Sequence, residues 1–338
     1  MTPPLDHLLR DLKDPKALPD PTTEVKVVQT HISMVFVGDR YVYKIKKPVN
    51  FGFLDFSTLQ KRAYYCEREL ELNRRLSKDI YIEVLPVRRE KGKYTLKPGT
   101  GDGVEYALRM KRIPEQRLMK QVFARGEITR DDLERVARVL ASFHLNAGRS
   151  HDIDQFGEPE RCKVNTDENF EQVAPYVGVT IGQQQLDRVK AWTEHFYTTR
   201  GPSFWDRIVQ GRIRDCHGDL HMEHVCLTED LPIIDCIEFN DRFRYGDTLS
   251  DIAFLLMDLE YHGGKDMAGI LWKAYKREAR EKGVEHLLTF YKVYRAFVRG
   301  KVNSFQVDDP AIAEVQKGPL METARRYFSL ACSYVNGH

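Results

Sequence analysis

The spacing of hydrophobic residues changes near residue 114, and this change limits the possible folds of the 338-residue chain more than any other feature. Before it, short runs of alternating apolar and polar residues, such as Tyr41–Lys46, indicate strands. After it, apolar residues recur at helical spacing, most clearly over residues 130–147. We therefore predict an α+β protein of two lobes, with a β-rich lobe at 1–113 and a mainly helical lobe at 114–338.

The first lobe is predicted to contain an antiparallel sheet of five strands, with one helix at residues 58–76 on one face. The second lobe is predicted to contain further helices at 183–199, at 247–260 and from 266 to the end. Two short apolar strands are expected to interrupt these helices. They are Val225–Leu227 and Ile233–Ile237.

Charge and composition exclude several classes of partner. Lysine and arginine total 52 against 50 aspartate and glutamate residues, so no basic surface for nucleic acid is expected. No apolar run approaches the ~18 residues of a membrane span, and the first residues lack the pattern of a secretion signal. The six scattered cysteines form no Cys-x-x-Cys pair, which indicates reduced thiols. We expect a cytoplasmic protein with neither a nucleic-acid nor a membrane partner.

The segment Asp215–Val225 carries the clearest chemical signal. Gly218 allows the tight backbone curvature that would present Asp219. The segment resembles the protein-kinase catalytic loop, His-Arg-Asp-x-x-x-x-Asn, in which the aspartate accepts a hydroxyl proton and the residue five positions later faces a metal ion. It is more similar still to the His-Gly-Asp-x-x-x-x-Asn loop of aminoglycoside phosphotransferases and choline kinases. Asp219 is therefore the candidate catalytic carboxylate, and His224 occupies the fifth position after it.

Further candidates occur in the order that phosphoryl transfer requires. Asp235 follows a short apolar run, where its carboxylate could hold a divalent metal ion. Lys44 lies in an early strand, and Glu69 in the helix that follows is placed to pair with it. Lys46 and Glu67 remain alternatives, because residues two apart in a strand share a face.

These segments together resemble the aminoglycoside phosphotransferase/choline kinase-like family, which has the protein-kinase-like two-lobed fold. The chain is most similar to the phosphotransferase region of predicted bifunctional aminoglycoside phosphotransferase/ATP-binding proteins. No Gly-x-x-x-x-Gly-Lys-Ser/Thr motif occurs, so we expect the phosphotransferase part without the ATP-binding second half. The segments that carry the resemblance are Thr30–Ser33, Tyr43–Phe56, Arg68–Leu76, the Asp219 loop and Asp235–Tyr245.

The resemblance implies an ATP-dependent phosphotransferase that acts on a hydroxyl of a sugar, an amino sugar or an amino alcohol, with Mg²⁺ as cofactor. In this reading Asp219 is the catalytic base and Asp235 holds the metal ion. Lys44 contacts the nucleotide phosphates, and Glu69 orients Lys44.

The resemblance also implies supporting roles around this centre. The segment that contains Met110 and Arg112 is similar to the interlobe segment whose backbone binds adenine. His217 resembles the structural histidine of the catalytic loop. Asp251 resembles the buried aspartate that braces this loop, although Asp247 could serve instead or cap the following helix.

The chain departs from the family pattern at two places. No Gly-x-Gly-x-x-Gly precedes Lys44, so phosphate binding is expected from backbone amides of the first hairpin and from the Ser33 hydroxyl. His224 stands where the family has asparagine. Mg²⁺ prefers oxygen ligands, so a neutral imidazole would favour Mn²⁺ or Zn²⁺, or would hold the metal ion through a water molecule. Mn²⁺ is therefore an expected alternative cofactor. His224 could instead orient Asp219, with Glu238 or Asp219 supplying an oxygen ligand.

Candidate residues for the acceptor substrate carry both charges. Acidic groups would suit a cation resembling an amino sugar, whereas arginines would suit a sugar acid or a phosphate. The sequence leaves the acceptor and the oligomeric state open. The acidic candidates are Glu238, Asp241, Asp258 and Glu260, and the basic candidates are Arg244, Arg295 and Arg299.

Two other functions remain as alternatives. The missing glycine-rich loop and His224 favour a nucleotide-binding pseudokinase, and the presence of Lys44, Glu69, Asp219 and Asp235 opposes it. A protein serine/threonine kinase is disfavoured, because the chain has neither Ala-Pro-Glu nor a recognisable activation loop.

Overall fold

The computed structural model of the protein describes residues 4–309 and 312–336. These residues divide into two compact units. The first unit holds the chain up to Gly126 together with Glu223–Asp241, and the second holds the rest. A segment from late in the chain therefore packs with the N-terminal part.

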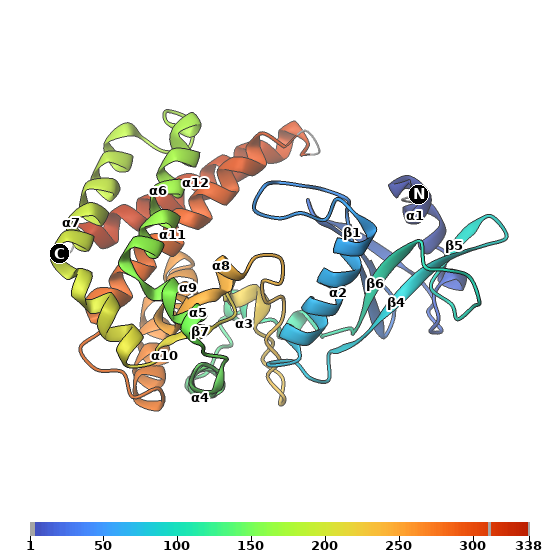
Figure 1. Ribbon diagram of the computed structural model, residues 1–338, viewed down its shortest axis with the longest axis horizontal. Helices are drawn as coiled ribbons and strands as arrows, with labels where there is room; N and C mark the ends of the chain where they lie inside the picture. The colour runs from blue at the N-terminus through green and yellow to red at the C-terminus, as the bar shows by residue number, and fades with distance from the viewer. Residues whose placement is uncertain (1–3, 310–311, 337–338) are drawn as a thin grey trace. The chain divides into compact units, whose positions relative to one another are not determined.

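The first unit is built on an antiparallel sheet (Figure 1). In its described residues the sheet has six strands in the order β1-β2-β3-β6-β4-β5. The hairpin of β2 and β3 sets Val35 opposite Lys44 and Ser33 opposite Lys46. The strands are β1 (Lys26–Gln29), β2 (Ser33–Val37), β3 (Tyr41–Lys46), β4 (Tyr81–Glu90), β5 (Lys93–Thr95) and β6 (Glu105–Lys111).

Two helices cover the two faces of this sheet. Leu8 and Leu12 of α1 (Leu5–Leu12) share one hydrophobic core with Tyr43 and Ile45 of β3. Because side chains alternate along a strand, Lys44 faces the other side, where α2 (Leu59–Asn73) packs on β4 and β6. The short helix α3 (Met119–Ala124) ends the N-terminal part of the unit.

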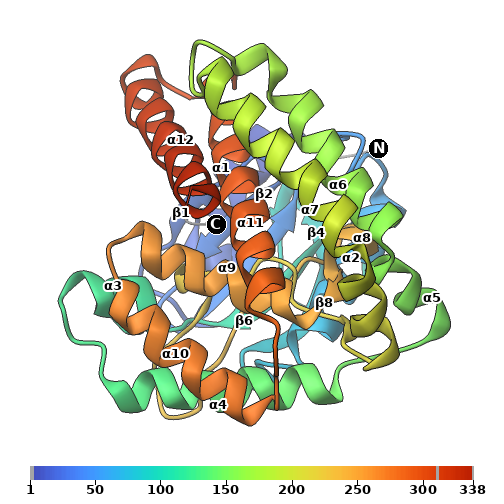
Figure 2. The same ribbon diagram turned by 90° about the vertical axis from the view of Figure 1, so that its left-hand side faces the viewer.

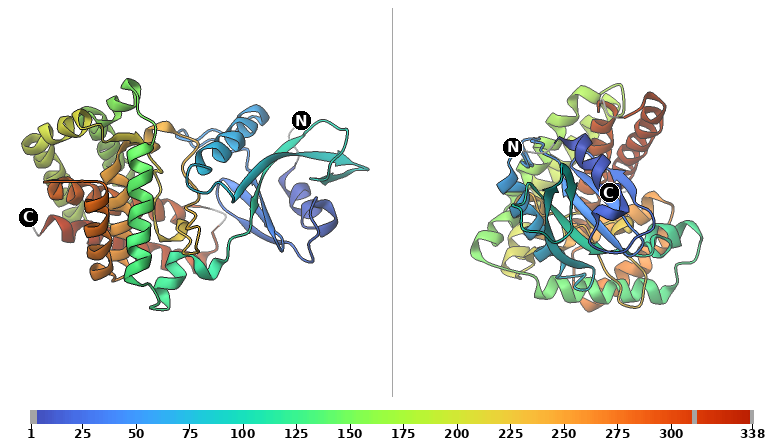
Figure 3. Two further views of the ribbon diagram at one scale, coloured as in Figure 1. Left: turned by 90° about the horizontal axis from the view of Figure 1, so that it is seen from below. Right: turned by 90° about the vertical axis from the view of Figure 1, so that its right-hand side faces the viewer.

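The second unit is mainly helical (Figure 2). Its hydrophobic core joins α9, α11 and α12 to α6 and α7, while α4 lies alongside α10 (Figure 3). A two-stranded ribbon, β7 with β8, lies next to the candidate catalytic loop in the sequence. The elements are α4 (Arg130–Asn146), α5 (His151–Asp154), α6 (Pro159–Val173), α7 (Gln183–Val209), β7 (Ile213–Asp215), α8 (Asp241–Arg244), β8 (Tyr245–Asp247), α9 (Thr248–Tyr261), α10 (Lys265–Glu278), α11 (Glu285–Val307) and α12 (Glu314–Val335).

The α+β class predicted from the sequence is confirmed, and the structure differs from the prediction in four details. The sheet has six strands in the described residues, not five, and helices cover both of its faces, because α1 packs opposite α2. The expected strands Val225–Leu227 and Ile233–Ile237 form isolated bridges instead, from Val225 to Ile233 and from Cys226 to Leu118. The ribbon of β7 and β8 was not anticipated, because each strand is only three residues long.

Two chemical features concern the whole described chain. None of the helices in residues 4–309 and 312–336 is both long and apolar enough to cross a membrane. The six cysteines carry free thiols, and five of them are buried.

Candidate functional site

The loop Cys216–Met222 is held in place through its backbone. Gly218 has a φ of 88°, in the left-handed region that favours glycine. The N–H groups of His217 and Gly218 donate to the two carboxylate oxygens of Asp251 at 2.6 and 2.9 Å. Arg295 Nη1 donates to the carbonyl oxygen of Gly218 at 2.8 Å. The loop geometry therefore depends on groups from α9 and α11.

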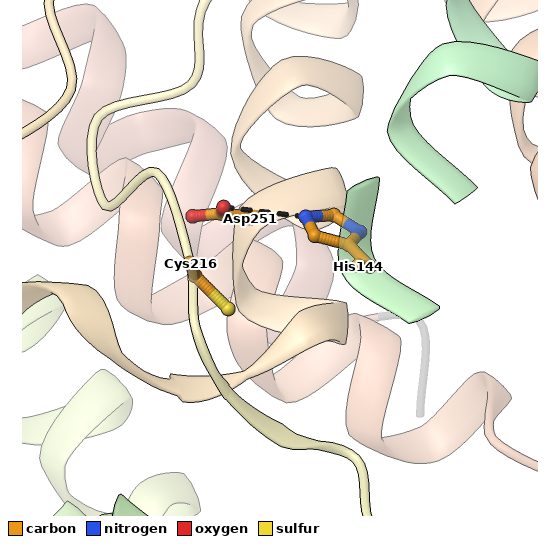
Figure 4. A group of neighbouring side chains, drawn as sticks. All are labelled: His144, Cys216 and Asp251. Carbon is orange, nitrogen blue, oxygen red and sulfur yellow. Dashed lines mark hydrogen bonds and ion pairs between the residues drawn. The ribbon is translucent and has the colours of Figure 1, made fainter. Parts of the chain in front are cut away.

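Asp251 is itself fixed by a buried histidine (Figure 4). His144 Nε2 lies 3.3 Å from Asp251 Oδ2, and its Nδ1 lies 2.8 Å from the Tyr275 hydroxyl. Burial alone would raise the pKa of Asp251, but the hydrogen bond and charge of His144 lower this pKa to about 2. The carboxyl group is therefore ionised at neutral pH. Cys216 also points into this cluster, and its Sγ lies 3.4 Å from the carbonyl oxygen of Gly246.

Asp247, the alternative brace, occupies a different position. Its carboxylate caps α9 by accepting the N–H of Leu249 at 2.9 Å. It also forms a bidentate ion pair with the buried Arg207, at 2.9 and 2.7 Å. Of the two aspartates, Asp251 is the one that accepts hydrogen bonds from the loop Cys216–Met222.

Asp219 is more accessible than the groups that hold its loop. Its side chain is 35% exposed, whereas that of Asp251 is 1% exposed. The Asp219 N–H donates to His217 Nδ1 at 3.3 Å, and His221 Nε2 lies 3.5 Å from Asp219 Oδ2. The loop ends at Met222, whose N–H donates to Asp258 Oδ2 at 2.9 Å. The arrangement presents one ionisable carboxylate from an otherwise buried loop.

In the first unit, Lys44 joins two candidates that are far apart in the sequence. Its Nζ lies 2.8 Å from Glu69 Oε1 and 2.7 Å from Asp235 Oδ1. Burial lowers the pKa of Lys44, but the charges of Asp235 and Glu69 outweigh burial and raise this pKa well above its usual value. Lys44 is therefore a permanent cation that is 15% exposed.

Lys46 contacts the same glutamate from deeper inside. Its Nζ lies 2.6 Å from Glu69 Oε2, and it also forms an ion pair with Glu238. Its ammonium group lies 4.7 Å from the centre of the Phe56 ring. Burial would raise the pKa of Glu69, but the charges of Lys44 and Lys46 outweigh burial and lower this pKa. At Glu238 burial has the larger effect, and the pKa of its carboxyl group is raised. Each lysine thus contacts one oxygen of Glu69, so both lysines pair with this glutamate.

Asp235 is held in an unusual backbone conformation. Its φ is 63°, in the left-handed region that few residues other than glycine adopt. Its N–H donates to the Tyr81 hydroxyl at 3.0 Å, and the next N–H, of Cys236, donates to Asn73 Oδ1 at 2.9 Å. Ser77 Oγ donates to the carbonyl oxygen of Ile233. Contacts to α2 and to the residues that follow it therefore aim the Asp235 carboxylate, which is 45% exposed.

His224 lies beside Asp235 in the first unit. Its Nε2 is 3.5 Å from Asp235 Oδ2, and its carbonyl oxygen accepts the N–H of Ile234 at 2.9 Å. One imidazole nitrogen and one accessible carboxylate oxygen are thus close enough to bind one divalent cation together. This mixed donor set fits Mn²⁺ as well as it fits Mg²⁺.

The residues expected to contact the nucleotide lie on the same sheet. Ser33 is buried, and among the described residues no group hydrogen-bonds its Oγ. It lies opposite Lys46, on the sheet face that carries the lysines. Met110 is partly buried near the end of β6, and the Arg112 N–H already donates to the carbonyl oxygen of Arg40 at 2.9 Å.

The candidate substrate residues fall into both units and differ in their partners. Glu238 is paired with Lys46, and Asp241 is exposed at the start of α8. Arg244 is buried and forms an ion pair with Asp215. Arg295 donates to the carbonyl oxygen of Gly218, and the Arg299 guanidinium lies 5.5 Å from the centre of the Tyr327 ring.

Several residues of the site escaped the sequence analysis. His144 and Tyr275 hold Asp251 from α4 and α10, and Tyr81 and Asn73 hold the backbone at Asp235. Of these, His144 lies among the buried apolar residues of α4, which was the available signal. That signal does not identify the partner.

This geometry, a braced aspartate loop and a lysine that bridges a glutamate and an aspartate, is typical of the class of phosphotransferases with a kinase-like fold. The model of the phosphotransferase enzyme family matches residues 33–286. The chain belongs to this family. The resemblance to the aminoglycoside phosphotransferase/choline kinase-like family and the predicted enzyme class, a phosphotransferase, are thereby confirmed.

Curated relatives match most of this chain. Uncharacterised proteins of Mycobacterium tuberculosis and Mycobacterium bovis are each 32% identical over 279 residues, covering 82% of this chain and 54% of each relative. The chain thus spans about half the length of the curated relatives it matches.

Two solved structures share the fold. A choline/ethanolamine kinase family protein from Mesorhizobium loti superposes with a TM-score of 0.54 and 14% identity over 94% of each chain. A protein described as an aminoglycoside phosphotransferase from Ralstonia eutropha superposes with a TM-score of 0.54 and 12% identity, over 98% of this chain and 97% of that chain. The predicted kinase-like fold is confirmed by these likenesses.

Proposed function

We propose that this protein transfers the γ-phosphoryl group of ATP to a hydroxyl group of a small molecule. The observation that carries the proposal is the contact of Lys44 with both Glu69 and Asp235, at 2.8 and 2.7 Å. A lysine that contacts phosphate, a glutamate that orients it and an aspartate for metal are the parts that kinases use. Family membership of residues 33–286 supports the same reaction.

In the proposed reaction, Asp219 accepts the proton of the acceptor hydroxyl. The acceptor oxygen then bonds to the γ-phosphorus, and the bond from this phosphorus to the β,γ-bridging oxygen breaks, releasing ADP. Asp219 suits this role because its carboxylate is accessible while its loop is fixed by Asp251 and Arg295. The residues that would hold a divalent cation are Asp235 and His224, and the cation would neutralise charge on the phosphate oxygens.

Two groups of the first unit support nucleotide binding there: the Ser33 hydroxyl of β2 and the backbone that follows β6. The Ser33 hydroxyl is buried without a partner among the described residues, on the face that carries Lys44, and a phosphate oxygen would satisfy it. In the interlobe segment the N–H groups of Lys111 and Arg112 already donate to backbone carbonyl oxygens. We therefore assign adenine recognition to the N–H of Ile113, which donates to no described residue, and to carbonyl oxygens beside Met110 and Arg112.

The test is transfer of the γ-phosphate of radiolabelled ATP to a panel of sugars, amino sugars, polyols and amino alcohols, with Mg²⁺ and with Mn²⁺. The proposal expects a labelled small-molecule product with at least one acceptor, and turnover with Mn²⁺ at least equal to that with Mg²⁺ because of His224. ATP binding without turnover under every metal and acceptor would contradict it.

A pseudokinase remains the second candidate, and one observation favours it. His224, not asparagine, is the neighbour of Asp235, at 3.5 Å. A His224→Asn variant separates the two functions. If the protein is a pseudokinase because of this histidine, the variant gains turnover that the wild type lacks. If the protein is an active kinase, the wild type turns over and the substitution shifts its preference from Mn²⁺ toward Mg²⁺.

A further inference from the structure

The acidic side chains of the second unit that could receive a cationic acceptor are already engaged. Asp258 is 4% exposed, and its Oδ2 accepts the N–H of Met222 at 2.9 Å. Glu260 forms a bidentate pair with Lys292, at 2.8 and 2.9 Å, and accepts the Tyr334 hydroxyl. An amino group of a substrate would have to displace these internal partners, so the unit offers poor recognition of a cation.

The second unit also places a cation close to the catalytic loop. Arg299 lies one helical turn after Arg295 on α11, and Arg295 donates to the Gly218 carbonyl oxygen at 2.8 Å. The Arg299 guanidinium lies 5.5 Å from the centre of the Tyr327 ring. The charge and hydrogen bond of Tyr327, together with the charges of Asp219 and Asp258, outweigh burial and raise the pKa of Arg299. Its position is therefore fixed between α11 and α12, within electrostatic reach of the catalytic carboxylate.

Arg299 has unused hydrogen-bonding capacity. Its Nε is buried, and among the described residues no acceptor hydrogen-bonds it. A buried N–H of a charged group is costly to leave unpaired, and an anionic oxygen is its strongest partner. The guanidinium is planar and presents several donors in one fork, the geometry that binds carboxylate and phosphate.

We propose that Arg299 binds an anionic group of the acceptor, so that the substrate is a hydroxyl compound that also carries a carboxylate or a phosphate, such as a sugar acid or a sugar phosphate. This inference rests on the proposed phosphotransferase function and names the substrate class of the same site. The inference selects an anionic acceptor over a cationic one, a choice that the mixture of acidic and basic residues leaves open. The structure gives Asp258 and Glu260 internal partners and leaves a donor of Arg299 for the ligand.

A competing role for Arg299 is contact with the transferring phosphoryl group. The two roles predict different kinetics. A residue that binds the acceptor anion affects only acceptors that carry the anion, and it acts mainly on KM. A residue that contacts the phosphoryl group lowers kcat for every acceptor alike.

The experiment uses one sugar ring with four substituents: glucose, glucosamine, glucuronate and glucose 1-phosphate. Acceptor binding to the full chain is measured by NMR titration without nucleotide, and transfer is measured with labelled ATP and Mn²⁺. The variants are Arg299→Gln and Arg299→Lys. Arg325→Gln is the matched control, because Arg325 is an exposed arginine of the same unit that donates to the Val179 carbonyl oxygen.

We expect the wild type to prefer glucuronate or glucose 1-phosphate, and the better of the two identifies the anion. Arg299→Gln is expected to lower kcat/KM for that acceptor by about 10- to 100-fold, through KM, and for glucose by less than about threefold. Arg299→Lys is expected to restore part of the loss, and Arg325→Gln to change nothing.

Three outcomes would overturn the inference. The first is a preference of the wild type for glucosamine. The second is an equal loss of kcat/KM for glucose and for the anionic acceptors in Arg299→Gln. The third is unchanged binding of the anionic acceptors by that variant. If the wild type transfers phosphate to another class of acceptor, only this inference fails. If it binds the anionic acceptors through Arg299 but never consumes ATP, the inference stands and the proposed function fails.

Discussion

Lys44 and Lys46 lie on the same face of β3, and they differ in how completely the protein encloses them. The Lys46 side chain is 1% exposed between two carboxylates, whereas that of Lys44 is 15% exposed and reaches the accessible Asp235. A fully buried charge is retained only when paired, so Lys46 chiefly holds Glu69 and Glu238 in place. Lys44 has the exposure that contact with a nucleotide phosphate requires.

The first prediction separates the two lysines. Lys46→Met leaves Glu238 without its cation and is expected to destabilise the protein by about 3 kcal/mol or more. Lys44→Met leaves Glu69 paired with Lys46, so we expect a loss of only about 1 kcal/mol but a fall in turnover of about 100-fold. Urea unfolding and the transfer assay measure both quantities. Equal destabilisation by the two substitutions would contradict this division of roles.

The second prediction uses the backbone of Asp235. Asparagine tolerates the left-handed region and alanine does not, so Asp235→Ala is expected to be about 1 kcal/mol less stable than Asp235→Asn. Both variants lose the carboxylate, and turnover is expected to fall equally in both. Chemical unfolding measures the stability of both variants. An alanine variant as stable as the asparagine variant would contradict the prediction.

The third prediction concerns pH. The pKa of Asp251 is about 2 in the folded protein against 3.8 as the ordinary value, so the unfolded chain binds the proton more readily. The stabilisation is complete above about pH 5 and is lost as the pH falls toward 2, reaching a loss of about 1 kcal/mol at pH 3 and about 2 kcal/mol at pH 2. The difference in unfolding free energy between the wild type and Asp251→Asn should shrink by these amounts. A difference independent of pH would show that Asp251 is not held ionised.

At the scale of elements, α11 connects the catalytic loop to the proposed acceptor site. It carries Arg295 and Arg299, and Gly300 lets it approach α12 closely. A Cβ at Gly300 would lie 2.7 Å from an atom of the Phe328 ring, which is closer than atoms can pack. The contact between α11 and α12 therefore depends on the absence of a side chain at this position.

The fourth prediction tests this contact. Gly300→Ala is expected to destabilise the protein by about 1–3 kcal/mol, because overpacking outweighs the better helix propensity of alanine. Gly269→Ala in α10 is the matched control, since no atom lies within 4 Å of a Cβ there, and it should stabilise by up to about 1 kcal/mol. Thermal and urea unfolding measure both variants. Stabilisation by Gly300→Ala would show that the helices are not in close contact.

Local pattern predicted the elements better than it predicted their partners. The alternation over Tyr41–Lys46 and the helical spacing over 130–147 correspond to β3 and α4. No pattern in α1 indicates that it covers the second face of the sheet, because amphipathicity gives the buried side of a helix and not what covers it. The three-residue strands β7 and β8 are too short to show a period at all.

The same limit applies to the site. The order of Lys44, Glu69, Asp219 and Asp235 was visible as a motif because each is a charged residue at a familiar spacing. The ion pairs of Glu69 with both lysines could not be predicted from the sequence. Lys44 and Lys46 are two residues apart in a strand, so their side chains share a face, and only the packing shows how their surroundings differ.

At the scale of the whole molecule, the chain order does not follow the compact units. Glu223–Asp241 packs with the N-terminal unit, so the candidate metal residues belong to the unit that carries Lys44. Asp219 belongs to the other unit, where Asp251 and Arg295 hold its loop. The residues proposed for the nucleotide and the metal ion thus lie in one unit, and the proposed catalytic base lies in the other.

We propose that Asp219 is the catalytic base, and the turnover of an Asp219→Asn variant is the direct test of this role. Transfer of labelled γ-phosphate and the equilibrium dissociation constant for ATP are measured on the wild type and this variant, with Mg²⁺ and with Mn²⁺. The account predicts that the variant binds ATP within about twofold of the wild type and transfers phosphate at least about 100-fold more slowly. Unchanged turnover in the variant would contradict the account.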